Sequence, residues 1–300
     1  IYAQLTGEDG YFDSRIVFVS ESGPPTDRKR RLAIMDQDGA EAEFLIPSVS
    51  TVLTPRFSPT SQTIIYSAYV PDPADPLATR LRTYLYDIET GRQEVLNEVA
   101  RASNYAARFS PDGRYVVMSR ERNGNSDIYT IELARRTETR LTTSPSVDVS
   151  PSYSADGRNI VFTSDRGGTP QLYVMRADGS EMNCPTGGRD TACRITFGDG
   201  RYSTPVWSPR GDWIAFTRQH QGRFYIGVIQ PDGQGERLLT ESYLDEGPTW
   251  SPNGRVIAFF REAAPGAGPK LWTIDLSGRN LRALRTPGDA SDPAWSPLLQ

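Results

Sequence analysis

Apolar and polar positions along this chain follow one pattern that recurs six times. Each copy opens with a short extended segment of the type Pro-x-aromatic-Ser-Pro, and five of the six then pass through a polar turn into an apolar run such as IVFTS or IAFTR, whereas the sixth ends after its opening segment. The Ser of the opening segment stands at positions 58, 110, 154, 208, 251 and 296. In the five complete copies an apolar or aromatic residue follows eight positions later, whereas the spacing between copies varies from 43 to 54 residues. This predicts a fixed structural unit joined by loops of adjustable length.

The residue types within each unit predict four strands. Pro-Asp-Gly and Pro-Asn-Gly suit a tight turn, because Pro presets φ, Asp or Asn bonds back to the backbone, and Gly accepts positive φ. The β-branched and aromatic run that follows is typical of a strand. A second apolar run (DIYTIEL, QLYVMRA) and a polar stretch (TRLT, ERLLT) complete the unit. Four strands in roughly 40 to 50 residues are typical of a β-propeller blade. The fold expected is therefore all-β, a six-bladed propeller with four-stranded antiparallel blades.

The two ends of the chain complement each other. The segment SRIVFVS (14–20) matches the second strand of a unit whose first strand is missing, and PAWSP (293–297) is a first strand with nothing after it. We expect the C-terminal strand to pair with Ile16–Val19 and to close the ring, which leaves no open edge there. The propeller would then span residues 14–300. Residues 1–13 lie outside it and are interpreted as the remnant of a preceding domain or a linker, with one or two helical turns in IYAQLTG ended by Gly7.

The composition restricts the classes of function. The formal charge of −4 and the pI of about 5.3 do not favour nucleic acid, which usually binds a basic face. No apolar run reaches the ~18 to 20 residues of a membrane helix, so no membrane span is expected. The chain is expected to be a monomer.

The sequence contains no convincing catalytic site. The only His, His220, lies between two predicted strands, and there is no G-x-S-x-G or H-E-x-x-H motif. We therefore expect a protein that is not an enzyme, with no catalytic residue, no cofactor and no metal motif. The aromatic residues of the opening segments recur at one position of every unit, which predicts packing between blades rather than ligand stacking. They are Phe57, Phe109, Tyr153, Trp207, Trp250 and Trp295.

Cys184 and Cys193 are the only cysteines. They bracket a short stretch with two Gly, which is flexible enough to close a disulfide in an oxidising compartment. The bond would fasten an inserted loop on blade four.

The segments that enter the first strand of each unit should surround one mouth of the central channel. They carry hydroxyl groups, acids and rings, which suit contact with another protein. These residues are Thr54, Tyr105, Asp148, Ser150, Tyr202, Ser203, Thr204, Asp245, Glu246 and Asp292.

The repeated phrase WSPDGxxIAF resembles the repeats of the TolB family, periplasmic proteins of Gram-negative bacteria. IYAQLTGEDGYFDSRIVFVS is similar to the family's junction between its N-terminal α/β domain and its propeller, and ESYLDEGPTWSPNG and the closing DPAWSP also match. The resemblance covers the whole chain. It implies a periplasmic scaffold of the Tol-Pal system that binds the peptidoglycan-associated lipoprotein Pal, supports outer-membrane integrity and constriction during cell division, and is exploited by bacteriocin translocation peptides. It also implies contact with TolA through a segment this chain lacks. Calcium in the channel is a further possibility.

The same resemblance assigns the Pal-binding face to the mouth described above. The positions that match best are Ser103, Asn104, Tyr105, Ala106, Val149 and Ser150. The chain departs from the family at two of them, because family members often carry His in place of Ser103 and Glu in place of Ser150.

Two alternatives from other classes remain open. The first is the substrate-gating propeller of a serine peptidase, which would require a hydrolase domain. The second is a propeller lyase or glycosidase, which would require clustered His or paired acids at the mouth.

Overall fold

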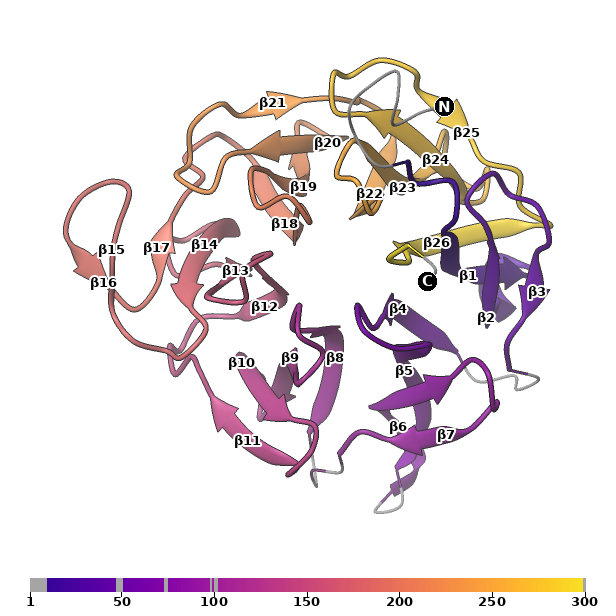
Figure 1. The fold of residues 1–300 in the computed structure, drawn as a ribbon, viewed down its shortest axis with the longest axis horizontal. Coiled ribbons are helices and arrows are strands. Elements are labelled where there is room, and N and C mark those ends of the chain that lie inside the picture. The colour runs from indigo at the N-terminus through magenta and orange to yellow at the C-terminus, as the bar shows by residue number, and fades with distance from the viewer. Residues whose placement is uncertain (1–9, 47–50, 73–74, 98, 100–101, 299–300) are drawn as a thin grey trace.

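The computed structural model describes residues 10–46, 51–72, 75–97, 99 and 102–298, which form six four-stranded antiparallel sheets arranged around a central channel (Figure 1). This confirms the predicted six-bladed β-propeller. The helical turns expected in IYAQLTG lie outside the described residues. Within the part of the chain that the structure describes, no helix has the length and apolarity needed to cross a membrane.

Each blade runs from an inner strand at the channel to a short outer strand at the rim. The strands of blades one to three, from the inside outwards, are β26 (Asp289–Trp295), β1 (Arg15–Ser22), β2 (Lys29–Asp36) and β3 (Glu43–Phe44); β4 (Val52–Phe57), β5 (Thr63–Asp72), β6 (Asp75–Asp87) and β7 (Gln93–Val95); and β8 (Ser103–Phe109), β9 (Tyr115–Arg122), β10 (Asn125–Glu132) and β11 (Thr137–Arg140). Those of blades four to six are β12 (Asp148–Tyr153), β13 (Asn159–Ser164), β14 (Gln171–Arg176) and β17 (Cys193–Arg194); β18 (Arg201–Trp207), β19 (Ile214–His220), β20 (Arg223–Ile229) and β21 (Arg237–Leu238); and β22 (Leu244–Trp250), β23 (Val256–Glu262), β24 (Lys270–Asp275) and β25 (Arg282–Ala283). A 3₁₀ turn, η1 (Pro25–Asp27), connects β1 to β2.

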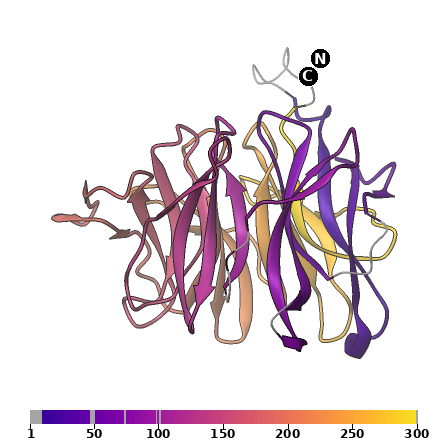
Figure 2. The ribbon, with the colours of Figure 1, turned by 90° about the horizontal axis from the view of Figure 1, so that it is seen from below.

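The ring closes as the two chain ends predict. Strand β26 pairs antiparallel with β1, with Ile16 opposite Trp295 and Val17 opposite Ala294. The first and last strands of the chain therefore form one blade. Because the pairing is antiparallel, β1 begins and β26 ends on the same face of the disc, the upper face in Figure 2.

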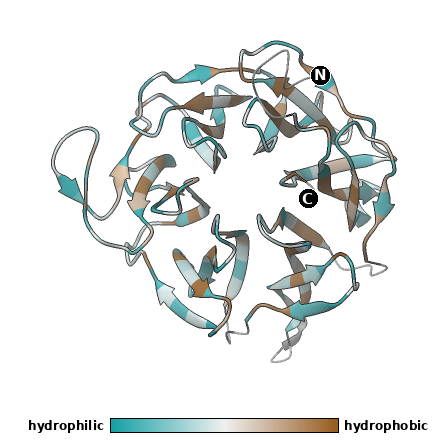
Figure 3. Ribbon diagram, in the orientation of Figure 1, coloured by the Kyte–Doolittle hydropathy of each residue, from teal (hydrophilic) through white to brown (hydrophobic). Residues whose placement is uncertain are grey.

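The core lies between neighbouring blades. Apolar side chains from the strands of one blade pack against those of the next, as Val17 and Val19 of blade one pack with Ile64 and Tyr66 of blade two. Hydrophobic colours accordingly lie mainly on the strands inside the blades, whereas the outermost strands and many of the loops are hydrophilic (Figure 3). The apolar residue eight positions after each repeated Ser is at most 2% exposed in every complete unit. Its constant spacing is therefore a constraint of inter-blade packing.

The last residues before β1 belong to the propeller core. Tyr11 is buried, and its ring meets Trp295 edge-on with centroids 5.5 Å apart. The indole of Trp295 donates a hydrogen bond of 2.9 Å to Ser14 Oγ. The described part of the expected 1–13 segment thus packs on the closing strand.

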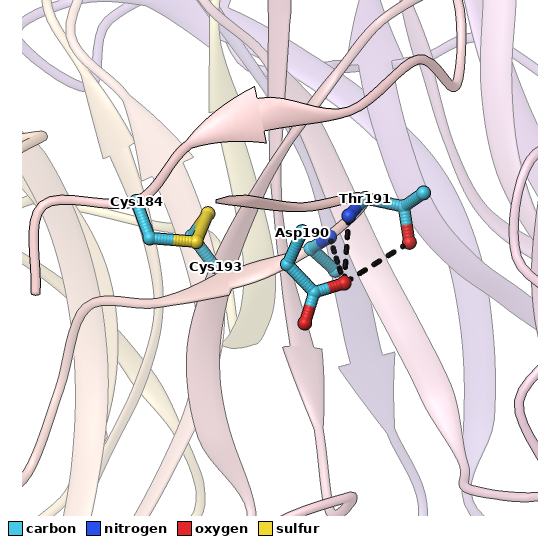
Figure 4. Close-up of a disulfide and its surroundings, with 5 residues drawn as sticks. Cys184, Asp190, Thr191 and Cys193 are labelled. Atoms are coloured by element: carbon cyan, nitrogen blue, oxygen red, sulfur yellow. Dashed lines mark hydrogen bonds between the residues drawn. A yellow bond between two sulfur atoms is a disulfide. The ribbon is translucent and has the colours of Figure 1, made fainter. Parts of the chain in front are cut away.

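Cys184 and Cys193 form the predicted disulfide, with Cα atoms 5.2 Å apart (Figure 4). The bond joins the insertion that contains β15 (Met182–Asn183) and β16 (Arg189–Asp190) to β17, the outermost strand of blade four. Thr191 N donates to the Asp190 carboxylate beside the bond. The disulfide therefore fastens an outer loop and lies away from the channel, as Figure 1 shows for β15 and β16.

We expect Trp295→Ala to destabilise the closed ring by about 3–5 kcal/mol, the usual result of truncating a buried aromatic residue. The substitution removes the contact with Tyr11 and the hydrogen bond to Ser14. Urea unfolding followed by far-UV circular dichroism measures the effect. Trp213→Ala is the matched control, because Trp213 is only half-buried at the edge of blade five. Equal losses in the two variants would contradict the role assigned to Trp295.

Candidate functional site

The channel has two mouths, which we name by the direction of the inner strands. The strand-start mouth is the opening at which β4, β8, β12, β18, β22 and β26 begin, and it contains the residues predicted to bind a partner. The strand-end mouth lies on the opposite face, where these strands run into their Ser-Pro turns. The inner strands contact one another around the ring, so each mouth is built from all six blades.

Every inner strand carries a bulge just before its middle. The pairing register with the second strand shifts at this point in each blade. One residue at each bulge has φ between 47° and 63°, in the left-handed region. The six residues are Thr54, Ala106, Ser150, Thr204, Gly247 and Asp292.

The residue that directly follows the left-handed one is Pro in five blades and Ala107 in the remaining blade. Pro lacks an N–H donor for the ladder, and a bulge is one of the places where a sheet tolerates it. Only one of the six left-handed residues is Gly, and Thr54 and Thr204 are β-branched, which makes their positive φ unusual. The bulges therefore hold strained backbone at the lining of the channel.

Two residues before each bulge, the side chain is buried between blades and takes no part in the surface of the mouth. Asn104 is 3% exposed, and Tyr202 and Asp245 are 0% exposed. Asp148 is also 0% exposed. This corrects the expectation that the side chains of Asn104, Asp148, Tyr202 and Asp245 form the rim. The physical reason is that the position faces the neighbouring blade, where polar groups must find internal partners.

In blades three, four and six these buried groups are satisfied by an arginine at or just after the end of the second strand. Arg120 Nε donates to Asn104 Oδ1 at 2.8 Å, and Arg261 donates to both oxygens of Asp245 at 2.6 and 2.7 Å. In blade five the Tyr202 hydroxyl donates to Glu236, which also accepts from Arg218. Arg166 holds Asp148 in blade four.

Sequence reasoning missed these arginines. A signal was present, because Arg120, Arg218 and Arg261 each stand ten positions after the repeated Ser. Charge-assisted bonds of this kind fix the start of the inner strand in blades three, four and six. These buried hydrogen bonds therefore hold the neighbouring rim residues in place, and they recur from blade to blade.

The structure brings together the predicted residues of blades three and four. Tyr105 lies opposite Ser119 of β9, and its hydroxyl is 2.8 Å from Ser126 Oγ. Ser119 Oγ in turn accepts a hydrogen bond of 2.9 Å from the amide of Ser150 in the next blade. Burial raises the pKa of Tyr105, so its hydroxyl stays neutral and can donate or accept. Ser103, Ala106 and Val149 are half-buried at the same mouth.

The acids of the strand-start mouth gather where blades six, one and two meet. The amide of Thr54 is 3.4 Å from Asp292 Oδ2, and Arg56 is the cation that acts most strongly on Asp292. Burial, followed by the charge of Asp292, raises the pKa of Glu246 to about 7. Burial also raises the pKa of Asp292, against the influence of Arg56. Among the described residues the Thr54 hydroxyl is buried without a hydrogen-bond partner.

Ser203, the remaining predicted residue, is half-buried beside Thr204, whose hydroxyl donates to Thr217 Oγ1 at 2.8 Å. Apart from the buried side chains, the predicted residues therefore fall into two half-buried groups, one at blades three and four and one at Thr54, Glu246 and Asp292. Ser203 lies between the two groups along the chain, in blade five.

These groups are a poor match to a calcium site. Within the described ranges no three acidic, His or Cys side chains come together in a way that could hold a metal ion. Asp245 is fully engaged by Arg261, and the charge of Asp292 is offset by Arg56. Calcium prefers six to eight oxygen ligands, so we derive no role for it from the side chains.

Comparison with known proteins places the whole chain in one family. The family model described as TolB beta propeller domain matches residues 2–299. Two proteins named Tol-Pal system protein TolB, from Gluconobacter oxydans and Dinoroseobacter shibae, are 47% and 55% identical over 99% and 100% of this chain. The chain spans 63% and 64% of their respective lengths. The crystal structure of TolB from Acinetobacter baumannii superposes with a TM-score of 0.83 at 30% identity, covering 99% of this chain and 70% of that one.

We expect Gly247→Ala to destabilise the protein by about 1–3 kcal/mol, because an L-residue at this positive φ is strained and an added Cβ would lie 3.1 Å from the Phe260 ring. Ala106→Gly is the matched reverse change at the equivalent bulge, and it should leave stability within about 1 kcal/mol of the parent, since relief of strain offsets the entropy of Gly. Urea unfolding measures both. A similar loss in the two variants would mean that the bulge backbone is not under strain.

We expect Glu246→Gln to stabilise the protein at alkaline pH. The raised pKa means that the folded state binds a proton more tightly than the unfolded state, so this carboxyl reduces stability as pH rises from about 4.5 to about 7. Glu246→Gln should remove that slope. The gain should reach at most roughly 3 kcal/mol above pH 7 and vanish below pH 4.5.

Chemical denaturation at pH 4, 6 and 8 measures this pH dependence. Glu241→Gln, which removes an exposed carboxylate at the rim of the neighbouring blade, is the control and should change stability little. If the difference between Glu246→Gln and the parent stayed constant with pH, Glu246 would not have the raised pKa described above.

Proposed function

Because the chain belongs to the TolB β-propeller family, we propose that it is the non-enzymatic docking propeller of a Tol-Pal system and that it binds the lipoprotein Pal at its strand-start mouth. The assignment to a Tol-Pal system rests on the homologues named Tol-Pal system protein TolB. The choice of mouth rests on the geometry of its residues.

The observation that carries the proposal is the contact between blades three and four. Ser119 accepts the amide hydrogen bond of Ser150 and lies opposite Tyr105, so the groups of two blades are held in one arrangement. The buried pair of Arg120 and Asn104 supports them from behind. A rim that is rigid before binding loses less conformational entropy when a partner docks, which favours affinity.

The chain's departures from the family change the chemistry expected there. Ser103 and Ser150 offer neutral hydroxyls where family members often carry an imidazole and a carboxylate. Contacts with Pal at these positions would be neutral hydrogen bonds, which are individually weaker than charge-assisted ones. We expect Tyr105 and Val149 to contribute more of the binding energy here, since aromatic and apolar anchors dominate most interfaces.

The wider role follows from the family. The protein would act in the periplasm, support outer-membrane integrity and constriction at division, and offer the same mouth to bacteriocin translocation peptides. TolA would be bound by a segment outside this chain, and a monomer would suffice for docking. Calcium in the channel stays a prediction.

No observation favours a second function. The gating propeller of a peptidase and a propeller lyase or glycosidase share the fold but need reactive groups at the mouth. Among the described residues, the half-buried acids there include Glu246 and Asp292, and His220 lies at the end of β19, opposite Arg223 in its hairpin. We therefore keep the docking role as the single proposal.

We expect Ser103→Trp to weaken binding of the soluble domain of Pal at least tenfold, or roughly 1.4 kcal/mol. Ser103 is half-buried on an extended strand, so a bulky side chain can be accommodated by projecting into the mouth. Isothermal titration calorimetry measures the affinity. Ala155→Trp places the same side chain on an exposed turn at the strand-end mouth and should bind like the parent.

The reverse result, with only Ala155→Trp impaired, would move the docking surface to the opposite face. No binding by the parent protein would reject the docking role itself.

A further inference from the structure

The strand-end mouth contains a cavity of about 330 Å³ that the docking role does not use. All six blades line it. Its wall includes the aromatic residue of each repeated segment and the Pro, or in one blade Ala155, two positions later. A volume of this size is at the lower end of the range for small-molecule sites in proteins.

Two arginines line the deeper part of this cavity, inside the inner strands rather than at the turns. They are Arg56 of β4 and Arg108 of β8, which occupy equivalent positions in adjacent blades. The other four blades place small or uncharged residues at this position: Ser152, Val206, Thr249 and Ala294. The propeller fold therefore does not require an arginine here, and the two cations interrupt the repeat.

The charge of this pair is only partly compensated. Arg56 donates to the carbonyl of Pro55 and lies near Asp292. Arg108 makes no hydrogen bond or ion pair within the described part of the chain, and Asp292 is the acid that acts on it. Burial, followed by the charge of Arg56, lowers the pKa of Arg108. Asp292 is thus the one carboxylate that acts on both guanidinium groups, which leaves a net positive charge in an aromatic-walled cavity.

We propose that this cavity is a binding site for an organic carboxylate, with the carboxylate held by Arg108 and Arg56 and its apolar body against the aromatic wall. A single negative charge balances the excess that Asp292 leaves. Guanidinium groups match the planar geometry of a carboxylate. The apolar wall favours such an anion over inorganic phosphate, which is strongly hydrated and has no apolar surface to bury.

Binding of 3-phenylpropionate to the 300-residue protein tests the proposal, with 3-phenylpropionamide and inorganic phosphate as comparison ligands. Calorimetry should detect the carboxylate, with weaker binding at higher salt, and should show at least about tenfold weaker binding of the amide and of phosphate. Arg108→Met should abolish detectable binding. Arg114→Met, on an exposed turn of the same blade, should bind like the parent.

A second measurement separates a ligand site from a structural role of Arg108. Removing a buried cation that has no partner should raise the Tm of the ligand-free protein, whereas loss of a structural arginine should lower it. Arg108→Lys keeps the positive charge but lacks the paired N–H donors of the guanidinium group. It should therefore bind the carboxylate more weakly than the parent. Unchanged affinity in Arg108→Met, or no binding of 3-phenylpropionate by the folded parent, would overturn the proposal. Either result leaves docking at the strand-start mouth unaffected.

Discussion

The antiparallel pairing of β26 with β1 is the interaction on which the rest of this structure depends. A propeller without it would be an open arc, and the inner strand of blade one would be absent from the channel. Several contacts outside the ladder reinforce the pairing: Arg28 bridges Glu21 of β1 and Asp289 of β26, and Ser291 donates to Glu21. Because Asp292 and Trp295 belong to this strand, the closure also completes both mouths of the channel.

Within the closed ring, the bulges determine which side chains face the channel. A regular strand would alternate its side chains between its two faces, and the shift of register re-aims the residues around each bulge. The buried residue two positions before each bulge then fixes where the bulge lies in the strand. The pairs of Arg120 with Asn104 and of Arg261 with Asp245 connect the second strand to the first within their blades, so a rigid interior determines the position of each rim residue.

The sequence predicted the architecture well because the fold is a repeat. The constant eight-residue spacing, the turn chemistry and the complementary ends gave the blade count, the closure and the disulfide loop. The rim was predicted less well. Tyr202 and Asp245 look like surface residues by type, but the bulge that follows them reverses the usual alternation, and no local motif marks it apart from the Pro after it. Their hydrogen-bond partners, Glu236 and Arg261, lie outside the inner strand, which single-strand patterns do not reveal.

The electrostatics of the two mouths are joined through Asp292. This acid influences Glu246 on the strand-start side and offsets the charge of Arg56 on the strand-end side. Removing Arg56 would take away the cation that opposes the raised pKa of Asp292, and a more protonated Asp292 would in turn repel Glu246 less. A change at Arg56 therefore alters both mouths. Arg108 belongs to the same group of charges, because Arg56 and then Asp292 act on it.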